Sequence, residues 1–162
     1  MKMSKLSHFD AKGAPRMVDV SPKSETSRVA RARARVRMSK ETWRLVRSGA
    51  TKKGDVLSVA RIAGIQAAKR TPELIPMCHP VRLVSVEMVV LAKKPGLVEV
   101  EATARAIDRT GVEMEALVAA TTAALTVYDM AKSHDRWMTI EGIELVEKSG
   151  GKSGHVRRAG RR

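Results

Sequence analysis

The chain has 162 residues, of which 43% are hydrophobic and 30% charged. This is enough to bury the core of one domain, and it excludes wholesale disorder. The single cysteine, Cys78, excludes an internal disulfide and a cysteine-rich zinc site. The apolar runs are too short to cross a bilayer, and residues 1–10 lack the apolar core of a signal peptide. We therefore expect a soluble, cytoplasmic protein with no membrane partner.

The net charge of +14 is concentrated in two segments of the chain. Residues 28–53 hold ten basic groups and one acidic group, and residues 148–162 hold six basic groups and none acidic. The body between them, residues 54–147, holds ten basic and thirteen acidic groups. Clustering of this kind indicates an anionic partner, either a nucleic acid or a small polyphosphate. A solvated basic surface remains the alternative interpretation.

The first elements are an arm and a strand. Residues 1–27 contain glycine, prolines and scattered polar groups, which favours an N-terminal arm that holds, at most, a short strand at residues 17–20. Apolar residues then alternate with arginines over residues 30–38. A period of two predicts a strand with one buried face and one arginine face.

Helices and strands follow in an order that suggests the fold. The pattern predicts a short helix between Ser39 and Gly49 and a second helix from Asp55 to about residue 70, which Thr71-Pro72 ends. A loop at 72–80 then leads to a hairpin of strands 81–92 and 97–108. A long, largely buried helix from Glu113 to about residue 132 and a strand at 138–147 complete the domain. This is the β-α-β-β-α-β order of a ferredoxin-like α+β unit. We expect residues 28–148 to form one antiparallel sheet with helices on one face, followed by a Gly/Lys/Arg-rich tail at 149–162.

The tail begins with a tract that could bind an anion. Residues 148–154 combine three glycines with two lysines, Lys148 and Lys152. Backbone N–H groups of a glycine-rich loop can point at an anion, and the lysines add charge. A Walker loop is excluded, because its first glycine would have to stand at Val146 and no helical pattern follows. A flexible tail without a ligand is the alternative.

A second candidate is the Cys-His pair between two prolines. Met77, Cys78 and His79 lie between Pro76 and Pro80, and proline on both sides restricts the local backbone. His79 is the better functional candidate, because an imidazole can transfer protons near neutral pH. Adjacent Cys and His cannot comfortably chelate one metal, and no second pair completes a set. The sequence therefore predicts no metal site, and a rigid loop with a buried cysteine is the alternative.

The long helix carries carboxylates at both ends. Glu113 and Glu115 lie in its first turn, where the helix dipole favours acidic residues without any function. Near its far end, Asp129 and Lys132 share one face at a spacing of i and i+3. Such a pair is an ordinary surface salt bridge, or a polarised acid–base couple if it is partly buried. We favour the couple.

Two further lysines flank the preceding helix. Lys53 stands directly before its start, where backbone amides also favour anions. Lys69 lies near its end, where a cation is favoured without any function. Lysines, a few carboxylates and one histidine together suit proton transfers on a polyphosphorylated substrate.

Seven blocks of the sequence, in this order, resemble the molybdenum cofactor biosynthesis protein C family: Met17-Val-Asp-Val, Lys53-Gly-Asp-Val, Ala60-Arg-Ile-Ala-Gly-Ile-Gln-Ala-Ala-Lys-Arg, Cys78-His-Pro, Gly111-Val-Glu-Met-Glu-Ala-Leu, Tyr128-Asp-Met and Lys148-Ser-Gly-Gly-Lys-Ser-Gly. The resemblance covers about residues 6–154. It implies a ferredoxin-like subunit in a homohexamer, a trimer of dimers, with active sites at subunit interfaces. It also implies conversion of 3′,8-cyclo-7,8-dihydro-GTP to cyclic pyranopterin monophosphate with loss of diphosphate. Residues 134–139 match no block, and the tail beyond 154 is additionally basic.

The resemblance also assigns roles to individual residues. It implies that Asp129 is catalytic, that Met77, Cys78, His79, Met114 and Glu115 bind substrate, and that Lys53, Lys69, Glu113, Lys132 and Lys148 are functional. We hypothesise that Asp129 and Lys132 are a coupled proton-transfer pair helped by Lys53. The loop 148–152, Lys69 and His79 would hold the phosphates. Crowded ammonium groups can lower the pKa of one lysine, which would make it a neutral base. No resident cofactor is expected, and Mg²⁺ bound to the triphosphate remains open.

The alternative from another class is a basic RNA- or DNA-binding module that uses the arginine strand and the C-terminal tail. Ferredoxin-like modules that bind RNA display aromatic residues on their central strands. The predicted strands at 81–92 and 97–108 contain none. We therefore favour the enzyme, with a small-molecule substrate and no nucleic-acid partner.

Overall fold

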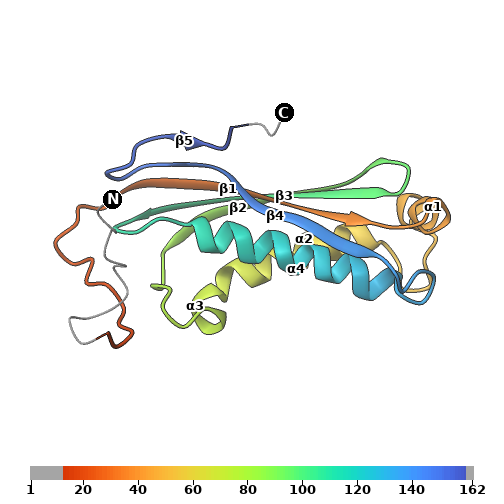
Figure 1. Cartoon of the computed structure of the whole chain (residues 1–162), viewed down its shortest axis with the longest axis horizontal. Helices are drawn as coiled ribbons and strands as arrows, with labels where there is room; N and C mark the ends of the chain where they lie inside the picture. Colours follow the sequence, from red (N-terminus) through yellow and green to blue (C-terminus); the bar gives the residue numbers. More distant parts are fainter. Residues whose placement is uncertain (1–12, 160–162) are drawn as a thin grey trace.

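The computed structural model describes residues 13–159 (Figure 1). The outermost parts of the predicted arm and tail, residues 1–12 and 160–162, lie outside the described residues. The elements are β1 (Thr26–Arg37), α1 (Lys40–Ser48), α2 (Val56–Lys69), α3 (Thr71–Leu74), β2 (Leu83–Lys94), β3 (Leu97–Asp108), α4 (Glu113–Ala131), β4 (Thr139–Ser149) and β5 (Val156–Arg157).

All five strands form one antiparallel sheet in the order β2-β3-β1-β4-β5. β1 lies between β3 and β4 and pairs with both along most of its length. Each helical connection passes over one strand, because the chain goes from β1 to β2 across β3 and from β3 to β4 across β1. This interleaving is the ferredoxin-like arrangement, and the predicted α+β fold is confirmed.

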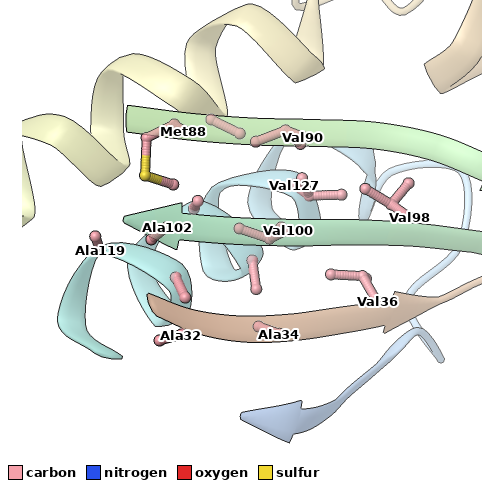
Figure 2. Close-up of a cluster of buried hydrophobic side chains, with 14 of the residues drawn as sticks. Ala32, Ala34, Val36, Met88, Val90, Val98, Val100, Ala102, Ala119 and Val127 are labelled. Atoms are coloured by element: carbon pink, nitrogen blue, oxygen red, sulfur yellow. The ribbon is translucent and has the colours of Figure 1, made fainter. Parts of the chain in front are cut away.

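The core lies between the sheet and the helices α2 and α4, which cover one of its faces (Figure 1). The predicted alternation holds, because every second residue of β1 and β3 is buried. Figure 2 shows this layer: Ala32, Ala34 and Val36 from β1, Val98, Val100 and Ala102 from β3, and Ala119 and Val127 from α4. Most of these side chains are short, so α4 packs close to the strands. Ten of its nineteen residues are buried, as expected.

Local capping explains where the helices begin. Ser39 accepts a hydrogen bond from the Thr42 N–H and starts α1, which ends at Gly49. The Asp55 carboxylate accepts from the N–H groups of Leu57 and Ser58 and starts α2. A side chain that satisfies these first N–H groups typically stabilises a helix by about 1 kcal/mol. The predicted boundaries of both helices are confirmed.

The opposite face of the sheet carries the arginines of β1, and they are paired. The ion pairs are Arg31 with Glu101 and Glu147, Arg33 with Glu144, Arg35 with Glu99, and Arg37 with Glu141. The glutamates come from β3 and β4, the strands on either side of β1. The positive charge of this strand is therefore neutralised within the sheet. The nucleic-acid alternative loses the arginine surface on which it rested.

Two local predictions were wrong, and one short element was not predicted. The short strand expected at residues 17–20 is absent, and the Val18 carbonyl is bonded to the His79 ring. The predicted loop at 72–80 begins as the short helix α3, since proline is well tolerated in a first helical turn. The tail folds back after Ser149, and β5 pairs with β4.

Candidate active site

The first cluster of predicted residues lies where α4 begins. Glu113 is in the first turn of α4 and Lys148 is near the end of β4, and Lys148 Nζ lies 2.7 Å from Glu113 Oε1. Both side chains line a hollow of about 890 Å³. Other residues of its wall are Lys23, Arg28, Arg109, Thr110, Gly151, Lys152 and Ser153. With Asp19 and Glu113 as its acidic members against five lysines and arginines, the wall has a net positive charge and suits a polyphosphate.

Arg28 is a member of this cluster that sequence reasoning missed. Its guanidinium is buried, and it donates to the carbonyls of Asp108 and Arg109 over 3.1 and 3.2 Å. Gly151 has a φ of 68°, which favours glycine, and a Cβ there would lie 1.8 Å from Arg28 Nη1, so a larger residue would strain the loop and displace the guanidinium. The sequence did contain a sign of this burial. The buried residues of β1 stand at even-numbered positions, and Arg28 is the first of them. An arginine in that register needs a special reason.

Glu115 is the most deeply buried acidic group in the cluster. Only 1% of its surface is exposed, and burial raises the pKa of its carboxyl group above the ordinary range. The Cys78 thiol donates to Oε1 over 3.7 Å, whereas Oε2 has no protein partner among residues 13–159. Glu115 and Lys69 line a second, smaller hollow of about 170 Å³. A buried acid with a free oxygen is suited to recognising a polar ligand group.

His79 ties the N-terminal arm to this cluster. Nε2 of the His79 ring lies 2.6 Å from the Val18 carbonyl oxygen. Because a carbonyl can only accept, Nε2 carries the proton and donates it to this bond. Met77 and Met114 are half-buried neighbours of Cys78 and Glu115 in the chain. The structure therefore gathers most of the predicted binding residues at this end of α4.

Cys78 is expected to resist alkylation by iodoacetamide near neutral pH. Burial, followed by the charges of Glu115 and Glu113, raises the pKa of this thiol to about 11, and only the thiolate is an effective nucleophile. Mass spectrometry of labelling rate against pH measures this directly. Glu115→Gln should move the profile to lower pH, whereas Glu73→Gln on α3 should not. A labelling rate that reaches half its maximum at a pH of about 8.5, the pKa of an unperturbed cysteine, would contradict the assignment.

The second cluster lies at the far end of α4. Asp129 pairs with Lys132 at 2.7 Å and with Lys53 at 3.2 Å. Lys53, from the loop before α2, also donates to the Asp129 carbonyl over 3.0 Å. The structure therefore brings together the three predicted catalytic residues, and all three are exposed in the single chain.

The electrostatics of this cluster differ from the expectation of a neutral lysine. The hydrogen bond from Lys132 is the main cause that lowers the pKa of Asp129, and the same bond raises the pKa of Lys132. Asp129 is 57% exposed and Lys132 54% exposed, so the pair is not the partly buried couple that we expected. The aspartate outweighs the effect of crowding between lysines. In the single chain Lys132 is held protonated, as a proton donor.

The two clusters are separated by the length of α4. Asp129 follows Glu113 by sixteen residues on the same helix, a rise of about 24 Å at 1.5 Å per residue. Figure 1 shows that α4 begins toward the end of the molecule where β4 turns into β5 and runs toward the end that carries α1. Within residues 13–159 the chain thus assembles two half-sites and does not bring them to one another.

Comparison with known proteins identifies the group to which this arrangement belongs. The model of the MoaC family matches residues 17–151, which include both clusters except Lys152. The chain belongs to the MoaC family. It is 57% identical to a cyclic pyranopterin monophosphate synthase of Thermomicrobium roseum, over 96% of this chain and 95% of the relative. It is 55% identical to a protein of the same name in Heliobacterium modesticaldum, over 94% of this chain and 97% of the relative.

The resemblance inferred from the seven blocks is confirmed by this membership of the MoaC family. A third relative, from Parvibaculum lavamentivorans, has the same name and is 56% identical over 95% of this chain and 97% of its own length. The segment 134–139, in contrast, was not covered by those blocks. As for membranes, residues 13–159 contain no helix that is both long and apolar enough to span one.

Proposed function

We propose that this chain is a cyclic pyranopterin monophosphate synthase of molybdenum cofactor biosynthesis. It converts 3′,8-cyclo-7,8-dihydro-GTP to cyclic pyranopterin monophosphate and releases diphosphate, which makes it a lyase. The observation that carries the proposal is the similarity along nearly the whole chain to relatives of that name. The two charged clusters on α4 supply a physical basis for such a reaction, which needs both phosphate binding and proton transfer.

The phosphates belong at the Glu113 end of α4. A triphosphate has several negative charges, and preorganised cations must neutralise them before the ring can react. Lys148, Lys152 and buried Arg28 line the same hollow, and we assign Lys69 and His79 as further phosphate contacts. The ion pair with Glu113 holds Lys148 in place. Intramolecular attack on the α-phosphorus, with loss of diphosphate, then depends chiefly on positioning.

The proton transfers belong at the Asp129 end. Rebuilding a purine-derived ring into a pterin requires successive proton additions and removals. Lys132 is protonated and can donate a proton to the substrate. The Asp129 carboxylate, 2.7 Å from the Lys132 ammonium, can accept one from it. Lys53 holds the other oxygen of Asp129. The three residues thus act as one coupled unit.

One active site needs both half-sites, so we propose that two subunits share it in a homohexamer, a trimer of dimers. The Glu113 end of one subunit would face the Asp129 end of its neighbour. The first support is the distance between the two ends. Glu113 and Asp129 are sixteen residues apart on α4, a rise of about 24 Å, so one chain does not bring its two half-sites together. The second support comes from apolar side chains exposed on α2 and α4, namely Val59, Ile62 and Leu125. Exposed apolar groups of this kind are typical of subunit contacts.

We place Mg²⁺, where it takes part, on the phosphate oxygens of the substrate. Among residues 13–159, no three His, Cys, Asp or Glu side chains gather in a way that could hold a metal ion. Mg²⁺ often enters a site in this manner, with its own waters and the phosphates as ligands. A substrate made from GTP also agrees with a cytoplasmic location for the enzyme.

Single-turnover assays on the purified cyclic intermediate test the proposal. We expect one equivalent of diphosphate and one of cyclic pyranopterin monophosphate per active site, and neither product from GTP itself. Tight, salt-sensitive binding of nucleic acid without any turnover would instead support a binding module and overturn the proposal.

A further inference from the structure

Trp137 is the most exposed large apolar side chain among the described residues. Its side chain is 87% exposed, whereas the other tryptophan, Trp43, is 7% exposed and belongs to the core. A tryptophan left in solvent is unusual, because its large ring gains most from burial. Trp137 also lies in the segment 134–139, which matched none of the family blocks. Neither the core nor the resemblance therefore accounts for it.

The loop that carries Trp137 is firmly held. Asp135 accepts from the Ser39 N–H over 2.8 Å with one oxygen and from the Trp137 N–H over 3.0 Å with the other. The Tyr128 hydroxyl donates to the Arg136 carbonyl over 2.9 Å. These bonds connect the loop to α1 and α4 and fix its backbone, while the indole extends into solvent. A group presented in this way loses little entropy when it binds a ligand.

The surroundings of the indole indicate what it binds. Trp137 and Lys132 line one hollow of about 480 Å³, together with Ser133, His134, Asp135 and Arg136. Asp135 already accepts two backbone hydrogen bonds, so the side chains left to meet a ligand there are mainly cationic. An aromatic face beside cationic groups suits a flat heterocycle that carries anionic substituents. Lys132 is also bonded to Asp129, so a ring stacked on Trp137 would lie next to the pair to which we assign the proton transfers.

We propose that Trp137 binds the heterocycle of the substrate by stacking on it beside Lys132. This inference rests on the proposed function, because the ring in question is that of the cyclic dihydro-GTP. It adds a binding contact from outside the blocks that define the family resemblance. Stacking of one base on an aromatic side chain is typically worth about 1–3 kcal/mol, and the loss should appear in KM.

Steady-state kinetics on the full chain test this contact. We expect Trp137→Ala to raise KM for the cyclic intermediate about thirtyfold, the middle of the range for base stacking, with kcat nearly unchanged. Trp137→Phe keeps a ring and should largely restore KM. Ile143→Ala removes an exposed apolar side chain from β4 and serves as the matched control. An unchanged KM in Trp137→Ala, with wild-type turnover intact, would overturn the inference and leave the proposed function standing.

Fluorescence supplies a readout that needs no turnover. In Trp43→Phe, Trp137 is the sole tryptophan, and we expect GTP to quench its emission in a saturable manner. Absence of quenching would overturn the inference. Sedimentation velocity separates another role: if Trp137→Ala dissociates the oligomer, the indole is a subunit contact and the inference is wrong. Failure of the wild type to turn over the cyclic intermediate would instead overturn the proposed function.

Discussion

Lys132→Ala is expected to slow single-turnover product formation by about 10²–10⁴-fold, the usual contribution of a general acid or base. The variant removes the ammonium group that lies 2.7 Å from Asp129. Because this ion pair is largely exposed, its contribution to stability is small, and the fold should be retained. Rapid quench of the purified chain with the cyclic intermediate measures the rate, and circular dichroism checks the fold.

The control for this prediction is Lys94→Ala, which removes an equal charge at the exposed end of β2. It should leave the rate near that of the wild type. Asp129→Asn should match the loss seen in Lys132→Ala, because the two groups act as one unit. If Lys132→Ala forms product at the wild-type rate, the assignment of the proton-transfer pair is wrong.

Two inactive variants are expected to restore activity when they are combined. Asp129→Asn disables one half-site, and Lys148→Ala disables the other. If each active site takes one half-site from each of two subunits, random assembly of equal amounts should recover about a quarter of the wild-type activity. The reason is statistical, since one site in four would receive both intact halves. Co-expression of the two chains followed by a turnover assay measures the recovery.

Co-expression of Asp129→Asn with Lys132→Ala is the matched control for this experiment. Both changes fall in the same half-site, which comes from a single chain, so no mixed site can be complete. We expect no recovery. Equal inactivity of both mixtures would show that the half-sites do not combine across subunits, and the shared-site proposal would fall.

Much of the fold could be predicted because its patterns are local. The alternation of alanine with arginine in β1 and of apolar with polar residues in β3 requires only a period of two, and the bounds of β3 are those predicted. Ser39 and Asp55 are residue types that cap helix N-termini, so the starts of α1 and α2 could be predicted from them. β5 could not be predicted in this way, because two residues carry no period and their pairing with β4 depends on a turn.

The candidate site could be predicted only where it follows one helix. The spacing of Asp129 and Lys132 on α4 puts them within reach, and the structure confirms their contact. Lys53 joins them through tertiary packing, which no local pattern describes. The pairing of the β1 arginines likewise depends on strand order and register, so charge counting overestimated their attraction for an anionic partner. The expected lowering of a lysine pKa by crowding does not apply to Lys132 for a related reason, because its hydrogen bond to Asp129 raises its pKa.

The short side chains between α4 and the sheet have a consequence for how the enzyme can be tuned. A helix packed closely on alanines and valines cannot slide or bend without opening voids, so it keeps its two ends at a constant separation. The shape of each assembled pocket is then decided by the relative placement of neighbouring subunits. We therefore expect evolution to adjust this chemistry through the outer surfaces of the helices, at exposed positions such as Ile62.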